Sequence, residues 1–363
     1  MSFDPADPLG PTFRAAVGAQ IEVFLAAQRD LLAETGDRLD LVWRQARRLA
    51  DGGKRMRPGF CYWGYVAVAE QPDPADPVLA VAASLDLLHA SALIHDDVID
   101  GSDTRRGRPS AHRFFARAHR RRGWLGQAEA FGFGAAIVLG DLLLAGSVAM
   151  AERSQVGSSR LKRARPYLDA ARCEVAAGQY LDLVHQASGP APADEQIGQA
   201  TLVMEFKTSK YTVARPVQIG AALGLAKRDT LAALGRFGSH LGHAYQMRDD
   251  LLGVFGDPAV TGKPAGDDLR EGKRTVLVAH ALSLAEPSQA AWLEELLSRP
   301  DLEPEDLRRA KRLLRDCGAV KRTERAIEVE AARALRYVSQ LDVSAPGLTA
   351  LTALTHAVVE REA

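Results

Sequence analysis

The chain has 363 residues, of which 47% are hydrophobic and 25% charged, a composition typical of a soluble globular protein. Its 46 basic and 46 acidic residues cancel, so no overall field favours binding to nucleic acid or to an acidic membrane. The three cysteines lack the spacing of metal ligands, and we interpret them as reduced thiols of a cytoplasmic protein. The N-terminus has no signal-peptide pattern. The most apolar window, residues 134–151, is interrupted by Asp141 and is predicted to be too short to span a membrane.

Apolar residues at three- and four-residue spacing predict helices along most of the chain. The predicted helical segments are 14–50, 78–100, 128–152, 164–186, 195–225, 229–256, 273–298, 304–315 and 319–340. Strand-like alternation is almost absent, and the breaks between the segments are short and rich in Pro, Gly and Asp. The sequence therefore predicts an all-α fold. We expect residues 1–12 to be disordered and residues 13–363 to form a single helical domain, a bundle of roughly ten helices.

A turn rich in glycine and basic residues occurs early in the chain, in DGGKRMRPGF. Lys54, Arg55 and Arg57 follow two glycines that leave the backbone open. Such a turn can bind an anion, although alone the pattern is more typical of a solvated turn.

Three aspartates end the predicted helix over 78–100, in LDLLHASALIHDDVID. Asp96 and Asp100 are four residues apart, so their carboxylates share one helix face, where like charges repel. No basic residue at that spacing on the same helix offsets them. Mg²⁺ would offset this repulsion, because it binds one or two carboxylates and bridges to phosphate oxygens. His89, two turns before Asp96 on the same face, is predicted to point the same way, although a histidine there also fits a helix core.

A second acidic group ends the predicted helix over 229–256. Asp249 and Asp250 lie there, with Gln246 one turn earlier on the face of Asp249, and the loop that follows carries Lys263, Asp267, Asp268 and Lys273. Two carboxylate groups with nearby Lys and Arg predict several Mg²⁺ ions holding a polyanion between two helices, and a diphosphate has a suitable charge and size.

These motifs resemble those of the trans-isoprenyl diphosphate synthases, or polyprenyl synthetases, in GGKRMRP, LLHASALIHDDVIDGSDTRRGRPS and YQMRDDLLGVFGDPAVTGKPAGDDLREGKRT. The resemblance implies an isoprenoid synthase type I fold around a central active-site cavity, and a homodimer. It also implies Mg²⁺, about three ions per active site. The implied reaction condenses isopentenyl diphosphate head-to-tail with dimethylallyl, geranyl or farnesyl diphosphate and releases pyrophosphate.

The same resemblance implies roles for residues at matching positions. The first aspartate-rich motif is Asp96, Asp97 and Asp100, with Asp96 and Asp100 as direct metal ligands, and the second is Asp249 and Asp250, with Asp249 as a ligand. The residues expected to hold isopentenyl diphosphate are Lys54, Arg57, His89 and Arg106. Those expected to hold the allylic diphosphate are Arg105, Lys207, Thr208, Gln246, Lys263 and Lys273. Gly253 stands where the family usually has a third aspartate, which predicts weaker binding of metal or of allylic substrate.

Small residues precede the first motif, and in the family this position limits chain growth. Ser91 and Ala92 are small, and the next bulky layer is Leu88, two turns before the motif. One helical turn rises about 5.4 Å, close to one isoprene unit. We therefore expect a product longer than farnesyl diphosphate, with geranylgeranyl diphosphate as the first choice.

Other readings of the sequence remain open. A class I terpene cyclase of the same fold would tolerate the altered second motif, but it has no use for Lys54, Arg57, His89 and Arg106. The eight arginines within residues 105–123 could instead bind RNA or an acidic partner, although the zero net charge argues against it. A farnesyl or longer-chain synthase and a catalytically silent subunit of a heteromeric synthase are further alternatives.

Overall fold

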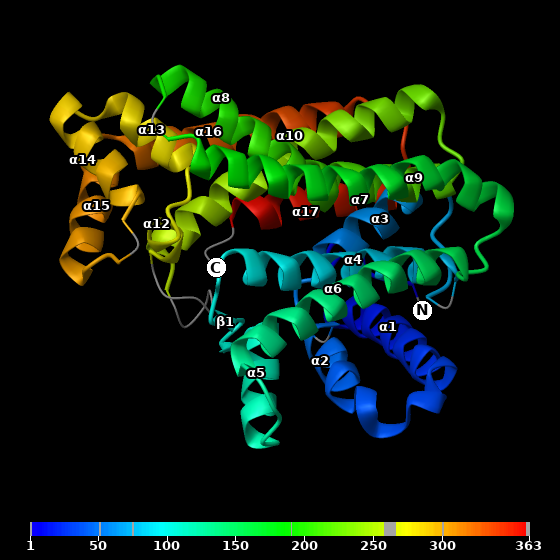
Figure 1. The fold of residues 1–363 in the computed structure, drawn as a ribbon. Coiled ribbons are helices and arrows are strands. Elements are labelled where there is room, and N and C mark those ends of the chain that lie inside the picture. Colours follow the sequence, from blue (N-terminus) through cyan, green and yellow to red (C-terminus); the bar gives the residue numbers. More distant parts are fainter. Residues whose placement is uncertain are drawn as a thin grey trace. The chain divides into compact units, whose positions relative to one another are not determined.

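The structure is a computed structural model that describes residues 2–50, 52–74, 76–189, 191–257, 266–299 and 301–360. These residues are mostly helical and contain almost no strand (Figure 1), which confirms the predicted all-α fold class. The elements are α1 (Pro11–Leu31), η1 (Ala33–Leu39), α2 (Asp40–Ala50), α3 (Met56–Val66), α4 (Val78–Ile99), β1 (Thr104–Arg105), β2 (Arg108–Pro109), α5 (Ala111–Arg121), α6 (Ala128–Glu152), α7 (Ser158–Ala187), α8 (Ala193–Met204), η2 (Glu205–Ala214), α9 (Arg215–Leu223), α10 (Arg228–Phe255), α12 (Asp267–Arg270), α13 (Val276–Leu284), α14 (Pro287–Leu297), α15 (Pro304–Asp316), α16 (Ala319–Ser339) and α17 (Ala345–Val359).

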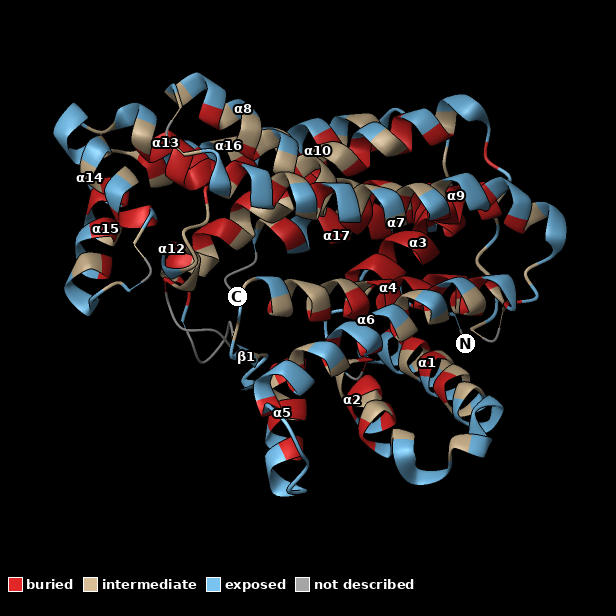
Figure 2. Ribbon diagram, in the orientation of Figure 1, coloured by how far each residue is buried: buried red, intermediate tan, exposed pale blue. Residues whose placement is uncertain are grey.

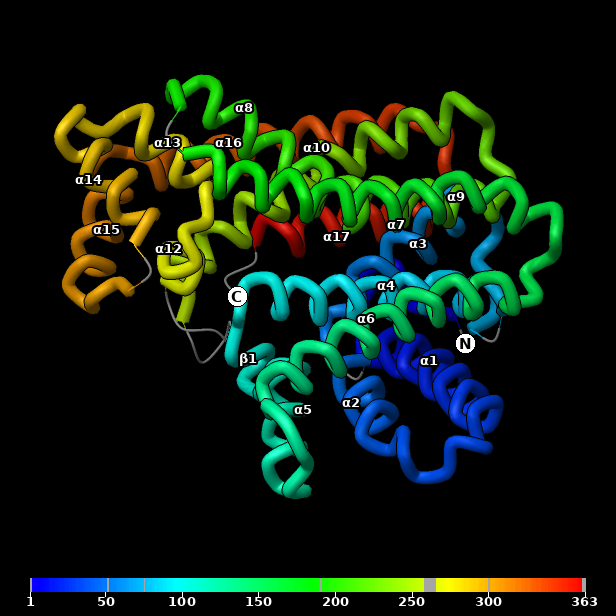
Figure 3. Tube along the Cα trace, in the orientation of Figure 1, coloured from blue at the N-terminus to red at the C-terminus, as the bar shows by residue number. Residues whose placement is uncertain are grey.

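Two of the predicted helices are each broken in two. The chain turns back between α1 and α2 (Figure 3), where Gly36 has φ 60° and ψ −137°, a conformation that only glycine adopts readily. The predicted helix over 273–298 is interrupted before Pro287, which begins α14, because proline lacks the N–H that would continue the preceding helix.

The described residues group into two compact units. Unit 1 consists of Met1–Asp169, Arg215–Ala232 and Asp342–Ala353, and unit 2 of Ala170–Ala214, Ala233–Leu341 and Leu354–Ala363. The single domain expected from the sequence stays a prediction.

The core of unit 1 is built on α3, which is buried along its whole length (Figure 2). Two glycines bring α3 and α9 into backbone contact. A Cβ on Gly64 would lie 2.4 Å from the carbonyl oxygen of Val217, and one on Gly220 would lie 1.7 Å from that of Cys61. Because α3 is buried on every face, its apolar residues are not confined to one side, which is why the sequence pattern did not predict it.

The N-terminal segment differs from the predicted disorder. Phe3 is buried and makes edge-to-face contacts with Phe13 and Tyr62, at ring-centroid distances of 5.2 and 5.1 Å. The indole N–H of Trp63 donates to the carbonyl oxygen of Pro8 at 2.9 Å. Burying one aromatic ring stabilises by roughly 1.5–3 kcal/mol, which favours ordering of this segment.

In unit 2, α13 packs against α8 and α16. The buried Arg274 side chain, just before α13, pairs with Glu294 of α14 at 2.8 Å.

Two helices, α4 and α6, are long and apolar enough to cross a membrane by length and composition alone. Helix α6 has 25 residues, so the argument that this apolar stretch is too short was wrong. Length alone is weak support for a membrane span, because core helices of soluble proteins pass the same test. The most apolar window of α4 is 72% buried, whereas that of α6 is 33% buried. Helix α6 therefore keeps an exposed apolar face, formed by Phe131, Ile137, Val138 and Val148.

Candidate functional site

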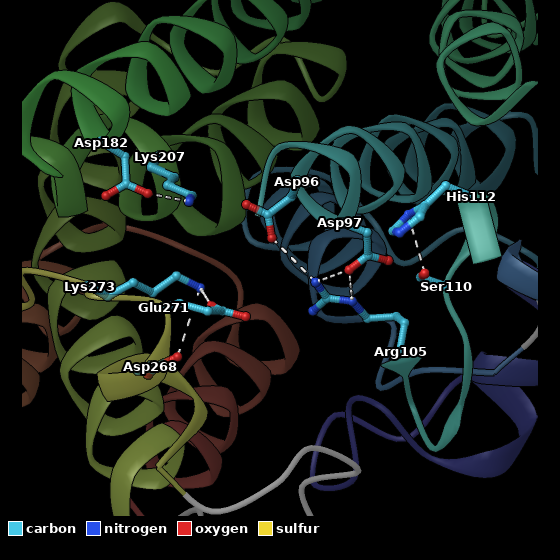
Figure 4. Close-up of polar contacts among 10 residues, drawn as sticks. All are labelled: Asp96, Asp97, Arg105, Ser110, His112, Asp182, Lys207, Asp268, Glu271 and Lys273. Carbon is cyan, nitrogen blue, oxygen red and sulfur yellow. Dashed lines mark hydrogen bonds and ion pairs between the residues drawn. The ribbon is translucent and has the colours of Figure 1, made fainter. Parts of the chain in front are cut away.

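The first acidic group lies at the C-terminal end of α4, and the side chain of Arg105 contacts it. Asp96 and Asp97 belong to the last turn of α4, and Asp100 is its C-cap residue. In the β1–β2 hairpin, Arg105 donates through Nε to Oδ1 of Asp97 at 2.9 Å, and its Nη2 lies 3.3 Å from Oδ2 of Asp96 (Figure 4). Asp97 is only 1% exposed. The guanidinium therefore holds the buried Asp97 in one orientation and places a positive charge beside Asp96.

The basic turn before α3 approaches the same hairpin. Gly52 and Gly53 have φ values of 79° and 85°. A Cβ on Gly53 would lie 3.0 Å from Nη2 of Arg106, so the turn and this guanidinium are in contact. Arg55 and Arg106 also have left-handed backbone, with φ of 54° and 52°. For a residue other than glycine that conformation costs about 1–2 kcal/mol, and such strain is concentrated at functional sites.

Sequence reasoning missed an ion pair that anchors this turn. Nη1 of Arg55 lies 2.7 Å from Oδ2 of Asp86, and both side chains are buried. Asp86 lies on α4 one turn before His89. The position of Asp86 one turn before His89 could have been noticed in the sequence. Its pairing with Arg55, however, could be known only from the fold.

His89 lies in a strongly positive field. Burial of its ring, followed by the charges of Arg57, Arg106, Arg105 and Arg55, lowers the pKa of His89 well below its usual value. Arg55 is paired with Asp86 and Arg105 with Asp97, yet four arginines near one imidazole are more positive charge than an apolar core would gather, since like charges repel. They are a good arrangement for a multiply charged anion, which would offset them through charge-assisted hydrogen bonds.

The second acidic group closes α10 in unit 2. Nε2 of Gln246 donates to Oδ1 of Asp250 at 2.7 Å, and Thr208 of η2 donates its hydroxyl to Oε1 of Gln246 at 2.6 Å. Asp250 is 3% exposed. Burial and the neighbouring carboxylates of Asp268 and Asp249 raise the pKa of Asp250 well above its usual value, against the opposing hydrogen bond from Gln246.

Asp268 occupies the space beside Gly253. A Cβ on Gly253 would lie 1.9 Å from Oδ2 of Asp268. The two segments are joined by a hydrogen bond from the backbone N–H of Gly266 to the carbonyl oxygen of Gly253, at 3.0 Å. A carboxylate from α12 thus lies where a side chain at position 253 would begin. The sequence named Asp268 only as part of the loop, because its closeness to Gly253 depends on how that loop folds.

Two lysines predicted to bind the allylic diphosphate lie beside carboxylates (Figure 4). Nζ of Lys207 donates to Oδ2 of Asp182 at 2.6 Å. Nζ of Lys273 pairs with Glu271 and lies 3.9 Å from Oδ1 of Asp268. The acidic partners hold both lysines in fixed positions.

The remaining predicted residues are placed as follows. Lys54 is exposed in the basic turn, and Lys263 lies outside the described residues. On α4, Ser91 and Leu88 are buried and Ala92 is partly exposed.

The carboxylates fit Mg²⁺ better than a softer metal. Asp249, Asp250 and Asp268 offer only oxygen donors, and a cation beside them would offset the mutual repulsion of Asp250 with Asp268 and Asp249. Among the described residues, no three His, Cys, Asp or Glu side chains form a complete metal cage. Mg²⁺ commonly keeps several waters and binds through one or two carboxylates and substrate phosphates.

Comparison with known proteins gives consistent results. The polyprenyl synthetase family profile matches residues 42–314. A geranylgeranyl diphosphate synthase of Mycobacterium tuberculosis is 31% identical, over 94% of this chain and 91% of its own length. A geranylfarnesyl diphosphate synthase of Aeropyrum pernix is 30% identical, over 92% and 97%.

A solved structure shows the same likeness. It is that of the Corynebacterium glutamicum geranylgeranyl pyrophosphate synthase complexed with isoprenyl diphosphate and magnesium. The match has a TM-score of 0.90 and 36% identity, and it covers 96% of this chain and 98% of that one. The protein therefore belongs to the polyprenyl synthetase family of prenyltransferases, as its motifs predicted.

Proposed function

We propose that the protein is a Mg²⁺-dependent prenyltransferase that condenses isopentenyl diphosphate head-to-tail with an allylic diphosphate, chiefly to geranylgeranyl diphosphate. One observation carries the proposal: α4 carries both an arginine-surrounded His89 and, two turns later, the carboxylate Asp96. The first group suits a bare diphosphate, and the second suits a diphosphate bound through metal. A condensation needs both.

Different residues bind the two substrates. Arg57, Arg106 and His89 bind isopentenyl diphosphate, with Lys54 at the edge of the turn, and orient its double bond, which removes much of the entropic barrier. Lys207, Arg105 and Lys273 place preorganised positive charge on the departing diphosphate. Asp96, Asp100 and Asp249 would hold Mg²⁺, which would supply positive charge to offset the negative charge developing on the same group.

The reaction balances without a further reactant. The allylic carbon–oxygen bond breaks, and the carbon so released bonds to the terminal alkene carbon of isopentenyl diphosphate. The positive charge then lies on the inner alkene carbon, and a proton leaves the methylene beside it so that a new double bond forms; the released pyrophosphate is the proposed acceptor. The 2.6 Å hydrogen bond from Nζ of Lys207 to Asp182 keeps the Lys207 side chain in place during this reaction.

The product length is proposed from the small residues on α4. Ser91→Phe is expected to shift the main product to farnesyl diphosphate or shorter, because the ring would fill the path of the growing chain. Ser91→Ala, which adds no bulk, should leave product length unchanged. Chromatography of the dephosphorylated alcohols measures both. An unchanged product length in Ser91→Phe would contradict the proposal that Ser91 lies along the path of the growing prenyl chain.

The nearest alternative activity is that of a terpene cyclase, which ionises an allylic diphosphate without coupling it. Radiolabelled isopentenyl diphosphate distinguishes the two, since a cyclase incorporates none into its product. Relatives are named farnesyl and geranylfarnesyl as well as geranylgeranyl diphosphate synthases, so these lengths are the alternatives for the product.

We further propose a homodimer in the cytoplasm with no membrane-spanning helix. The exposed apolar face of α6 supports this, because a second copy of the chain would cover Phe131, Ile137 and Val138. The polar Asp141 is exposed on the same helix, which disfavours burial of α6 in lipid. Light scattering of the purified protein should give twice the chain mass.

A further inference from the structure

A charged cluster of side chains joins α10 to η2 and α16 within unit 2. We call it the His243 cluster, and it consists of Glu205, Ser239, His240, His243 and Glu330. Nε2 of His243 lies 2.7 Å from Oε2 of Glu205, and its Nδ1 lies 3.7 Å from Oε2 of Glu330. The hydroxyl of Ser239 donates to Oε1 of Glu205 at 3.0 Å. His243 therefore bridges a carboxylate of η2 and one of α16.

The cluster lies at the start of a π-helix that carries two predicted substrate ligands. Glu205 is the first residue of η2, and Lys207 and Thr208 follow in its first turn. The wide turn of a π-helix is rare and is frequently found at functional sites. Such a segment needs contacts with neighbouring elements to keep its shape.

Helix α10 supplies those contacts along η2. A Cβ on Gly242 would lie 2.4 Å from Cα of Ser209, and one on Gly238 would lie 2.3 Å from Cα of Ala214. The hydroxyl of Ser209 donates to the carbonyl oxygen of Ser239 at 2.8 Å. The glycines thus bring the two backbones together over the later part of η2, and the Glu205–His243 pair holds its beginning.

The pair is ionic at neutral pH. Burial acts to lower the pKa of His243, but its ion pairs with Glu205 and Glu330 outweigh burial and raise the pKa to about 9. Burial acts to raise the pKa of Glu330, but its ion pair with His243 and its hydrogen bond with His240 lower that pKa to about 2. Other charged groups that face the cluster are Lys210 of η2 and Arg333 of α16, and Arg236 of α10 lies over the Tyr337 ring on which His240 stacks.

We propose that His243 is a positioning residue: paired with Glu205, it fixes the first turn of η2 on α10 and so holds Lys207 and Thr208 for the allylic diphosphate. This inference rests on the proposed function. The effect reaches substrate through η2, and Gln246, one turn after His243, is joined to the same segment by the 2.6 Å hydrogen bond from Thr208.

The test compares two histidines on one helix. His243→Gln removes the charge that holds Glu205 and is expected to raise KM for the allylic diphosphate about tenfold, with KM for isopentenyl diphosphate unchanged. His240→Gln is the matched control. His240 also pairs with Glu330, at 2.6 Å, and stacks on Tyr337, so its partners belong to α16 rather than η2. It should leave both KM values unchanged. Glu205→Gln removes the other partner of the ion pair and should give the same KM changes as His243→Gln. It therefore tests the inference even if His243→Gln folds poorly.

The pH dependence supplies a second readout. A histidine whose pKa is raised on folding from 6.5 to about 9 contributes stabilisation that is complete below the unfolded value and is lost as pH rises through 9. In the wild type, KM for the allylic diphosphate should therefore rise above pH 9, whereas in His243→Gln this step should be absent.

Equal changes in both KM values, or the same change in His240→Gln, would show that His243 only stabilises the fold and would overturn the inference. If the wild type couples isopentenyl diphosphate and both His243→Gln and Glu205→Gln keep wild-type KM values, the inference is overturned but the proposed function is not. A wild type that forms no prenyl product would overturn the proposed function and this inference with it.

Discussion

Asp96→Asn is expected to reduce kcat about a thousandfold, because the amide lacks the charge that we propose holds Mg²⁺ beside the leaving diphosphate. The asparagine has nearly the same shape, and Arg105 keeps its hydrogen bond to Asp97 at 2.9 Å. Folding should therefore be preserved. Steady-state rates with radiolabelled isopentenyl diphosphate at saturating Mg²⁺ measure the effect.

Asp103→Asn provides the control for this variant. Asp103 lies just after α4, is exposed, and pairs with Arg113 at 2.6 Å. An exposed pair of this kind contributes about 0–1 kcal/mol, so the rate should change little. If Asp96→Asn kept more than a tenth of the wild-type rate, Asp96 could not be a metal ligand in the reaction.

Arg106→Gly is expected to raise KM for isopentenyl diphosphate about 10–100-fold without destabilising the protein. The guanidinium is one of the charges that act on His89, and its removal weakens the anion site. At φ 52°, however, glycine is at least as favourable as arginine. The melting temperature should therefore stay the same or rise.

This opposition between binding and stability separates a functional arginine from a structural one. Arg108→Gln, in the same hairpin and equally exposed, should change neither quantity. A lower melting temperature for Arg106→Gly, or an equal rise in KM for the allylic substrate, would contradict its assignment to isopentenyl diphosphate.

The sequence predicted the fold class and the family because these depend on local patterns. Amphipathic periodicity located α10, α15 and α16, and the aspartates of α4 have a fixed spacing that is readable without a structure. The periodicity failed for α3, which is buried on all sides, and for residues 2–12, where a single aromatic ring, Phe3, decides the packing.

The site was predictable where one helix carries the chemistry and not where the fold brings segments together. The turn containing Lys54 was identified, but the Arg55–Asp86 pair that anchors it joins residues 31 apart in the sequence. Gly253 was recognised as a departure from the family pattern, yet only the structure shows the carboxylate of Asp268 in the space beside it. The weaker metal binding expected from Gly253 stays a prediction, and Asp268 gives a physical reason to expect less loss.

The most direct test of the central claim, that α4 serves two diphosphates in different ways, is calorimetric titration of each substrate alone with and without Mg²⁺. For the allylic substrate, an analogue whose bridging oxygen is replaced by sulfur prevents turnover. The account predicts that chelating Mg²⁺ abolishes binding of the analogue, whereas isopentenyl diphosphate still binds at its arginines. Metal-independent binding of the analogue, or loss of both ligands together, would contradict it.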